Sequence, residues 1–141
     1  MTAICDKKFV TGDSFSIRKE ITEEEILSFA DISGDHNPLH IDRDVAERSV
    51  FGKQVAHGAL VSSYISAVIG MRLPGPGTIY LEQKCSFLKP VFIGDSIIVT
   101  VTIKEIDQNR NAVLDTVVKN QNGVTVLEGY AKVRLPKAET I

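Results

Sequence analysis

The segment His57 to Met71, "HGALVSSYISAVIGM", constrains the fold most, because it is long and contains no Asp, Glu, Lys or Arg. Apolar or small residues occupy almost every side of this segment when it is drawn as a helix, and its polar side chains are mostly small hydroxyls. A helix without a charged face is normally buried all round. The cluster "PGPG", Pro74 to Gly77, supplies a stop signal. We therefore expect a central helix with protein on all sides.

The residues after this helix are rich in Val, Ile and Thr and are divided by turn signals. The expected strands are Thr78 to Leu88, Ser96 to Ile106, Ala112 to Asn120 and Val124 to Leu135. One buried helix followed by four long strands predicts an antiparallel sheet wrapped around that helix, which is the hot-dog architecture of the α+β class. The length suits a single domain, residues 1–141. Because a lone sheet leaves open edges and an uncovered face, we expect a homodimer.

The part of the chain before the central helix contains signals for a strand and two helices. Alternating apolar and polar residues over Asp13 to Lys19 predict a strand. Thr22 and Glu25 form a capping-box pattern that begins a helix, and Gly34 is a suitable stop. We expect a second, short helix from Asp42 to Ser49.

Composition excludes several classes of function. The net charge is −2 and no basic stripe is present, which argues against a nucleic-acid partner. No run approaches the roughly 18 apolar residues that a membrane span needs, and the N-terminal residues lack the apolar core of a secretory signal. We therefore predict a cytoplasmic protein with no membrane partner. The two cysteines, Cys5 and Cys85, suggest neither a disulfide framework nor a zinc site.

The stretch "FADISGDHNPLH", Phe29 to His40, is the first candidate site. Asp35 and His40 are five residues apart, so their side chains would diverge on a continuous helix. Pro38 and the preceding Asn37 disfavour a helix there and indicate a turn. In such a turn an acid and an imidazole can share one water molecule, with one group accepting its proton while the other orients it. The alternative is an Asx-type turn followed by a surface histidine without a function.

His57 and Gly58 form the second candidate site, at the start of the central helix. Gly58 would expose backbone N–H groups that favour developing negative charge, as an oxyanion hole does. The alternative is a buried helix start in which glycine allows close packing. The hydroxyls of Ser62, Ser63 and Ser66 follow, and we expect at least one of them to bond back to the helix backbone.

Other chemistries lack their motifs. The chain has no G-x-S-x-G elbow, and Cys85 lies within an expected strand without a neighbouring base. His36, His40 and His57 lack a familiar metal-ligand spacing, so no metal site is predicted. Glycine motifs for dinucleotides or phosphates are missing too. What remains is proton transfer beside a polarised carbonyl.

The two candidate sites together resemble a known family. "FADISGDHNPLHID", followed by "FGKQVAHGALVSSYIS", is similar to the MaoC-like dehydratases, specifically the (R)-specific enoyl-CoA hydratases (hydratase 2). "GTIYLEQKCSFLKPVFIGD" resembles the central strand and following turn of that family, and the likeness covers roughly Ile21 to Leu135. The resemblance implies a single MaoC-like hot-dog domain that forms a homodimer. It also implies a hydro-lyase that adds water to trans-2-enoyl-CoA, giving (R)-3-hydroxyacyl-CoA, or catalyses the reverse dehydration, without a cofactor.

The resemblance also implies roles for individual residues. Asp35 and His40 correspond to the catalytic pair, which would act on one water placed against C3 of the enoyl thioester. Negative charge on the thioester oxygen would meet the Gly58 N–H. The expected substrate-binding residues are Asn37, Ser66 and His57, and the basic residues nearest these motifs, as candidates for the CoA phosphates, are Lys53, Lys84, Lys89 and Arg72.

Three other functions fit the same residues. An (R)-3-hydroxyacyl-ACP dehydratase of fatty-acid synthesis would use the same chemistry on another carrier. A hot-dog acyl-CoA thioesterase would activate water against the thioester carbonyl and release free CoA thiol. A non-catalytic acyl-CoA-binding or subunit-pairing protein would have a decayed site, and the complete set of Asp35, Asn37, Pro38 and His40 argues against decay.

Overall fold

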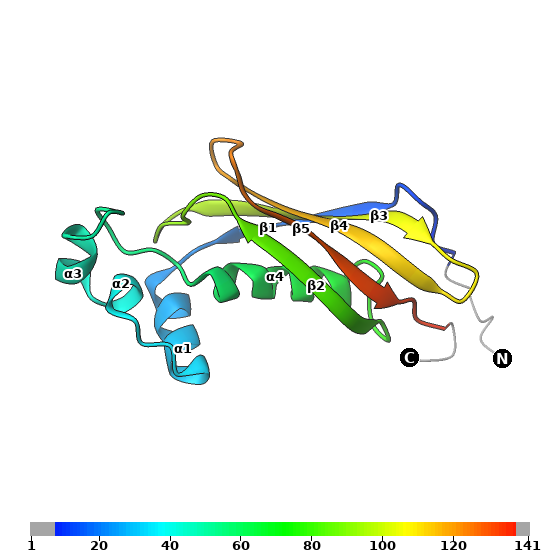
Figure 1. Ribbon diagram of the computed structural model, residues 1–141, viewed down its shortest axis with the longest axis horizontal. Helices are drawn as coiled ribbons and strands as arrows, with labels where there is room; N and C mark the ends of the chain where they lie inside the picture. The colour runs from blue at the N-terminus through cyan, green and yellow to red at the C-terminus, as the bar shows by residue number, and fades with distance from the viewer. Residues whose placement is uncertain (1–7, 138–141) are drawn as a thin grey trace.

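The computed structural model describes residues 8–137. In chain order these form β1 (Ser14–Glu20), α1 (Glu23–Ser33), α2 (Pro38–Ile41), α3 (Arg43–Glu47), α4 (Gly58–Met71), β2 (Ile79–Phe87), β3 (Ser96–Ile106), β4 (Asn111–Asn120) and β5 (Thr125–Arg134). The five strands form one antiparallel sheet in the order β1-β3-β4-β5-β2. Figure 1 shows α4 lying under the curved sheet, with α1, α2 and α3 gathered near the end where α4 begins. The predicted hot-dog architecture is confirmed.

The core lies between α4 and the concave face of the sheet. Alternate residues of β3 are fully buried, and β4 repeats the same alternation, as expected for strands with one covered face. The buried row of β3 consists of Ile97, Val99, Val101 and Ile103. Against it α4 places Val61, Ile65 and Val68, each no more than 3% exposed. These two apolar surfaces hold the sheet on the helix.

The prediction that α4 is buried all round is wrong for a single chain. Ser63, Ser66, Ala67 and Met71 are exposed, and the exposed fraction of Met71 reaches 69%. The helix has no charged face because small and hydroxyl-bearing residues line its open side. Lack of charge on a helix therefore did not distinguish burial within one chain from an uncovered face.

The expected start and stop signals of α1 are confirmed. The Thr22 hydroxyl accepts a hydrogen bond from the Glu25 N–H, and the Glu25 carboxylate accepts one from the Thr22 N–H, so the capping box is complete. Gly34 ends the helix with φ of 82°, a left-handed conformation that glycine adopts without strain. The expected helix from Asp42 to Ser49 is shorter than predicted, with Asp42 capping α3 as expected.

The sequence did not predict α2. The segment expected to be a turn contains one helical turn over Pro38–Ile41, which the Asn37 side chain caps by accepting from the Leu39 N–H. Proline is well suited to the first position of a helix because its missing N–H would have no intrahelical partner. The same Pro38 that excludes a continuous helix from α1 therefore begins a new one.

Candidate active site

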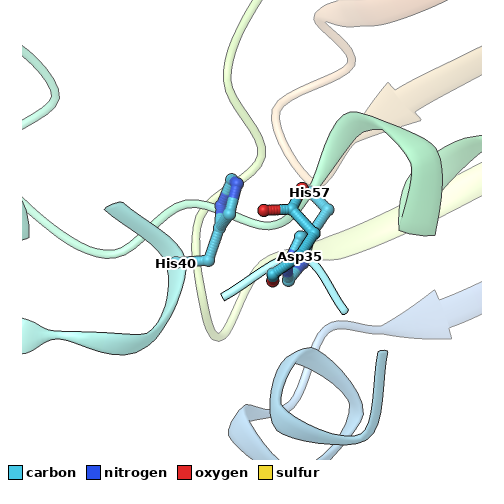
Figure 2. Close-up of side chains that lie close together, drawn as sticks. All are labelled: Asp35, His40 and His57. Atoms are coloured by element: carbon cyan, nitrogen blue, oxygen red, sulfur yellow. The ribbon is translucent and has the colours of Figure 1, made fainter. Parts of the chain in front are cut away.

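The candidate site lies where three segments meet: the loop after α1, the single turn of α2 and the residue before α4. Figure 2 shows Asp35, His40 and His57 from these segments close together. A carboxylate oxygen of Asp35 and one ring nitrogen of each histidine lie within 4.8 Å of one another. One water molecule bonded to two groups spans such a separation, since each hydrogen bond is about 2.7–3.0 Å long. The structure thus brings together the two side chains that the sequence singled out.

Asp35 is held in an exposed turn by short-range hydrogen bonds. Its N–H donates to the Ser33 hydroxyl at 3.1 Å, and its carboxylate accepts from the Asn37 N–H at 3.2 Å. This is the Asx-type turn that the alternative interpretation expected. The turn does not remove the acid from the site, because a carboxylate has further lone pairs free to accept a hydrogen bond.

His40 is oriented by the extended segment that precedes α4. Its Nδ1 lies 2.7 Å from the Val55 carbonyl oxygen, and because a carbonyl only accepts, Nδ1 carries the proton. In a neutral ring, Nε2 is then the free acceptor. The Gln54 amide donates to the His40 carbonyl at 3.0 Å, and the Ala56 N–H donates to the Val91 carbonyl. These bonds fix the segment, and with it the direction of the His40 ring.

His57 is the buried member of the cluster. Its side chain is 2% exposed, and its Nε2 donates to the Asp35 carbonyl oxygen at 2.9 Å. Its ring stacks on His40 with 3.9 Å between centroids and 29° between planes. The ring therefore contacts protein groups rather than open space. Its expected role in binding substrate stays a prediction.

Two imidazoles and a carboxylate are the ligands of many metal sites, but their orientation here is unsuitable. Metal bonds lie in the plane of an imidazole, and the rings of His40 and His57 are stacked nearly parallel. With 3.9 Å between centroids and 29° between planes, the in-plane lone pairs of the two rings lie in separate stacked planes, which is unfavourable for binding one ion. The arrangement fits a shared proton better than a shared metal.

Gly58 begins α4, and no side chain caps this helix end. By contrast, Thr22, Asn37 and Asp42 cap α1, α2 and α3. The Gly58 N–H has no acceptor within its own helix, and the dipole of a 14-residue helix adds positive potential there. An ideal Cβ at Gly58 would lie 2.8 Å from Cε1 of Phe87, so glycine also allows close packing. Glycine therefore allows close packing here, as one interpretation expected, and its role in an oxyanion hole stays a prediction.

A cavity of about 880 Å³ opens beside the site. Its walls are largely apolar, while His40, Gly58 and Ser62 provide polar groups. Asp35 and Asn37 do not line it. The apolar walls include Leu39, Phe51, Val55, Val61, Phe87 and Val91. Such a cavity suits an acyl chain with its reacting end near His40.

The serines of α4 differ in their position relative to the cavity. Ser62 lines the cavity, whereas Ser66 is exposed and lies outside the lining. The expected back-bonding is confirmed for Ser62 and Ser63, whose hydroxyls donate to carbonyls three residues earlier. Within one chain the structure therefore places Ser62, not Ser66, near Gly58. Regular spacing along the helix would have favoured Ser62, since it lies one turn after Gly58.

Of the four basic candidates, Lys89 lines the cavity. Lys53 instead lies over the Phe92 ring, with Nζ 4.4 Å from the centroid. Arg72 caps the far end of α4, where its guanidinium lies 5.7 Å from the Phe15 ring. Lys84 is exposed on β2 and does not belong to the lining. Lys89 is thus the basic side chain best placed to meet a ligand in the cavity.

Comparison with known proteins identifies the family. The family model of the MaoC like domain matches residues 8–125. The chain belongs to the MaoC-like family. It is 42% identical over 125 residues to a (R)-specific enoyl-CoA hydratase of Rhodospirillum rubrum, covering 89% of this chain and 87% of that protein. It is 40% identical over 123 residues to a 3-hydroxybutyryl-CoA dehydratase of Methylorubrum extorquens, covering 87% and 78%.

A solved MaoC-like relative has the same fold. The structure of the (R)-hydratase from Aeromonas caviae involved in PHA biosynthesis superposes with a TM-score of 0.90 at 35% identity. The superposition covers 92% of this chain and 99% of that one. Within residues 8–137, no helix of this MaoC-like chain is long and apolar enough to cross a membrane.

Proposed function

We propose that this chain is an (R)-specific enoyl-CoA hydratase, a hydro-lyase that reversibly adds water to trans-2-enoyl-CoA to give (R)-3-hydroxyacyl-CoA. The observation that carries the proposal is the convergence of Asp35 and His40 within 4.8 Å beside an apolar cavity, in a chain whose MaoC-like relatives have this activity in their names. The catalytic pair is Asp35 and His40, and no cofactor takes part.

General acid–base catalysis follows from the hydrogen bonds of the pair. A water between them donates one hydrogen to the Asp35 carboxylate and the other to Nε2 of His40, since the Nδ1 proton is committed to Val55. Its lone pair is then directed at C3 of the enoyl thioester. Asp35 takes the proton as the C3–O bond forms, and the C2=C3 electrons move towards the thioester carbonyl. A proton returned to C2 by the pair completes the addition.

The negative charge that develops on the thioester oxygen needs a donor. Gly58 is suited to this role because its N–H has no intrahelical acceptor and stands at the positive end of α4. The thioester then lies between Gly58 and the catalytic pair, and the acyl chain extends along the apolar walls. Lys89 is the candidate contact for a CoA phosphate.

We further propose that two copies of this single-domain chain form a dimer, which is expected to work in the cytoplasm. The edge strand β2 carries four large apolar residues that are at least 38% exposed, namely Ile79, Tyr80, Leu81 and Phe87. The uncovered side of α4 adds Ala67 and Met71 to this exposed apolar surface. Exposed apolar surface of this extent is typical of an interface. Sedimentation should give a mass near twice 15.4 kDa, and a monomer alone would contradict the dimer.

The deciding experiment adds purified protein to crotonyl-CoA and follows the ultraviolet band of the enoyl thioester. Loss of the band, with (R)-3-hydroxybutyryl-CoA identified by chiral analysis, is the expected result. The matched control variant for Asp35→Asn is Asp31→Asn, since Asp31 is an exposed residue of α1 whose carboxylate, among residues 8–137, bonds only to His36. That variant should keep full activity.

Two other outcomes would replace the proposal. Turnover confined to ACP thioesters would indicate an (R)-3-hydroxyacyl-ACP dehydratase. Release of free CoA thiol, measured with a thiol reagent, would indicate a thioesterase, because hydration leaves the thioester intact. Absence of turnover with crotonyl-CoA, longer enoyl-CoA chains and ACP thioesters would exclude a hydratase.

A further inference from the structure

His57 touches both members of the catalytic pair from within the protein. Its Nε2–H donates to the Asp35 carbonyl oxygen at 2.9 Å, a bond that spans 22 residues of sequence. One face of its ring stacks on His40 at 3.9 Å, and Phe29 packs against it at 4.9 Å with the planes tilted by 59°. Figure 2 shows the ring next to Asp35 and His40.

The loop that carries Asp35 has few other ties to the body of the protein. Across the described chain, the hydrogen bonds of residues 34–37 otherwise join them to partners between residues 30 and 40. Such bonds fix the internal shape of the loop but not its position relative to α4. Among the hydrogen bonds of residues 34–37 in the described chain, the bond from His57 is the one that joins the loop to the start of α4.

An imidazole at position 57 destabilises the folded state in a way that an apolar ring would not. Nδ1 of His57 is buried and has no hydrogen-bond partner among the described residues, and a buried polar atom without a partner is destabilising. Stacking between Phe29 and His40 needs only a flat ring. The Nε2–H bond to Asp35 is therefore the one contact that requires histidine.

We propose that His57 is a positioning residue that sets the distance between the Asp35 carboxylate and the His40 ring. Its catalytic consequence rests on the proposed function, whereas its effect on the Asp35 loop does not. Nε2 holds the loop from one side while the ring face supports His40 from the other. Without that bond the loop keeps its turn but moves relative to His40, and the shared water loses one of its two acceptors.

The central test is His57→Phe, which keeps a flat buried ring and removes the donor. We expect kcat for crotonyl-CoA to fall about 100-fold, as misplacement of a catalytic group by an ångström does, while KM changes little. The unfolding midpoint should stay unchanged or rise, because the buried unpartnered nitrogen disappears.

The control variant is Phe29→Leu, because Phe29 packs on the same ring but does not bond to the loop. It should lower the unfolding midpoint and leave kcat close to wild type. His57→Gln is the rescue variant, since its Nε2 amide reaches about as far as the ring Nε2 and can donate to Asp35. It should recover part of the activity that His57→Phe loses.

Hydrogen exchange supplies a readout that does not depend on the reaction. In His57→Phe, amides of residues 35–40 should exchange faster than in wild type, whereas amides of β3 and β4 should not. If the wild-type protein hydrates no enoyl thioester, the proposed function is wrong, but the hydrogen-exchange test of His57 still applies. Unchanged exchange in the loop, or parallel losses of kcat and stability in His57→Phe and Phe29→Leu, would overturn the positioning role.

Discussion

The sheet with α4 and the segment from Asp35 to His57 are held together in different ways. In the sheet, long ladders of backbone bonds and continuous buried rows fix each strand, as for Val99 and Val101 with no exposed surface. In the site segment, Asp35 is exposed, and α2 and α3 contain four and five residues. A small number of directed bonds, such as His40 to Val55, determine its shape.

This difference teaches where stability and activity are located. Many small packing contacts stabilise the sheet, so a change there should lower the free energy of unfolding. Single hydrogen bonds place the reactive groups, so a change in the site segment should lower turnover and leave the fold intact. Substitutions that separate these two effects test the comparison directly.

The largest expected effect belongs to the catalytic pair. Asp35→Asn should lower kcat about 10³-fold, equivalent to about 4 kcal/mol of activation free energy, because the water loses its base. The unfolding midpoint should not change, since the carboxylate is exposed and an amide oxygen can still accept from the Asn37 N–H. Steady-state kinetics and thermal denaturation of the same preparation measure both.

The double variant sharpens this prediction. His40→Ala alone should cost a similar factor, and Asp35→Asn with His40→Ala should cost little more than either change, because the two groups act as a unit. Near-normal turnover in both single variants would disprove the assignment of the pair.

The second effect is a loss of stability in the sheet. At Gly129 of β5 an added Cβ would lie 1.8 Å from the Lys84 carbonyl oxygen, a backbone atom of β2 that cannot move independently. Gly129→Ala should therefore lower the free energy of unfolding by about 3 kcal/mol or more, as measured by chemical denaturation. The control is Ser86→Ala on β2, which adds no atoms and should behave as wild type.

Turnover per folded molecule should be nearly unchanged in Gly129→Ala at low temperature. If Gly129→Ala is as stable as wild type, the close approach of β2 to β5 is incorrect. The comparison between the sheet and the site segment would then lose its main support.

How far the sequence could predict this molecule follows the same division. The strands after α4 were predicted to within one residue, because runs rich in Val, Ile and Thr between turn signals favour extended structure. Thr22 and Gly34 were equally predictable, since capping depends on residues close in sequence. Convergence of Asp35 and His40 was one of two interpretations of the turn at Asn37 and Pro38, and the family resemblance favoured it.

Contacts between residues far apart in the sequence could not be predicted from the sequence pattern. No spacing rule links His57 to the Asp35 carbonyl, or Val55 to Nδ1 of His40, because these bonds depend on how α4 docks beside the loop. The open side of α4 was also missed, since small residues suit both a buried helix and an uncovered one. The sequence thus identified the candidate catalytic pair but not the groups that hold it.

A third and smaller effect compares Gly58 with Gly129. At Gly58 an added Cβ would lie 2.8 Å from Cε1 of Phe87, which is a side-chain atom and can be displaced more easily than the backbone of β2. Gly58→Ala should therefore cost less than about 1 kcal/mol of stability. The displaced ring should crowd the cavity and raise KM for crotonyl-CoA about tenfold, equivalent to about 1.4 kcal/mol.

The companion variant for Gly58→Ala is Phe87→Leu in the same chain. A smaller side chain makes room for the new methyl group, so KM should return towards wild type. An unchanged KM in Gly58→Ala alone would show that the Phe87 ring does not border the acyl site.

The smallest expected effect lies on the outer side of the site segment, at His36. The hydrogen bond to the Asp31 carboxylate, supported by the Gly34 carbonyl, raises the pKa of His36 above its ordinary value of 6.5. A raised pKa means that the protonated ring is favoured in the folded state. The small stabilisation is therefore fully present below pH 6.5 and is lost as the pH rises through the raised pKa.

NMR titration of the His36 ring protons should show the elevated value, and Asp31→Asn should bring it back towards 6.5. Turnover should follow this titration only weakly, because the His36 ring bonds to Asp31 and Gly34 and the charge of Asp35 is the smallest of the causes that raise its pKa. A fall in kcat on Asp31→Asn would instead show that the pair of Asp31 and His36 helps to position the catalytic pair. The site segment would then have to include the end of α1.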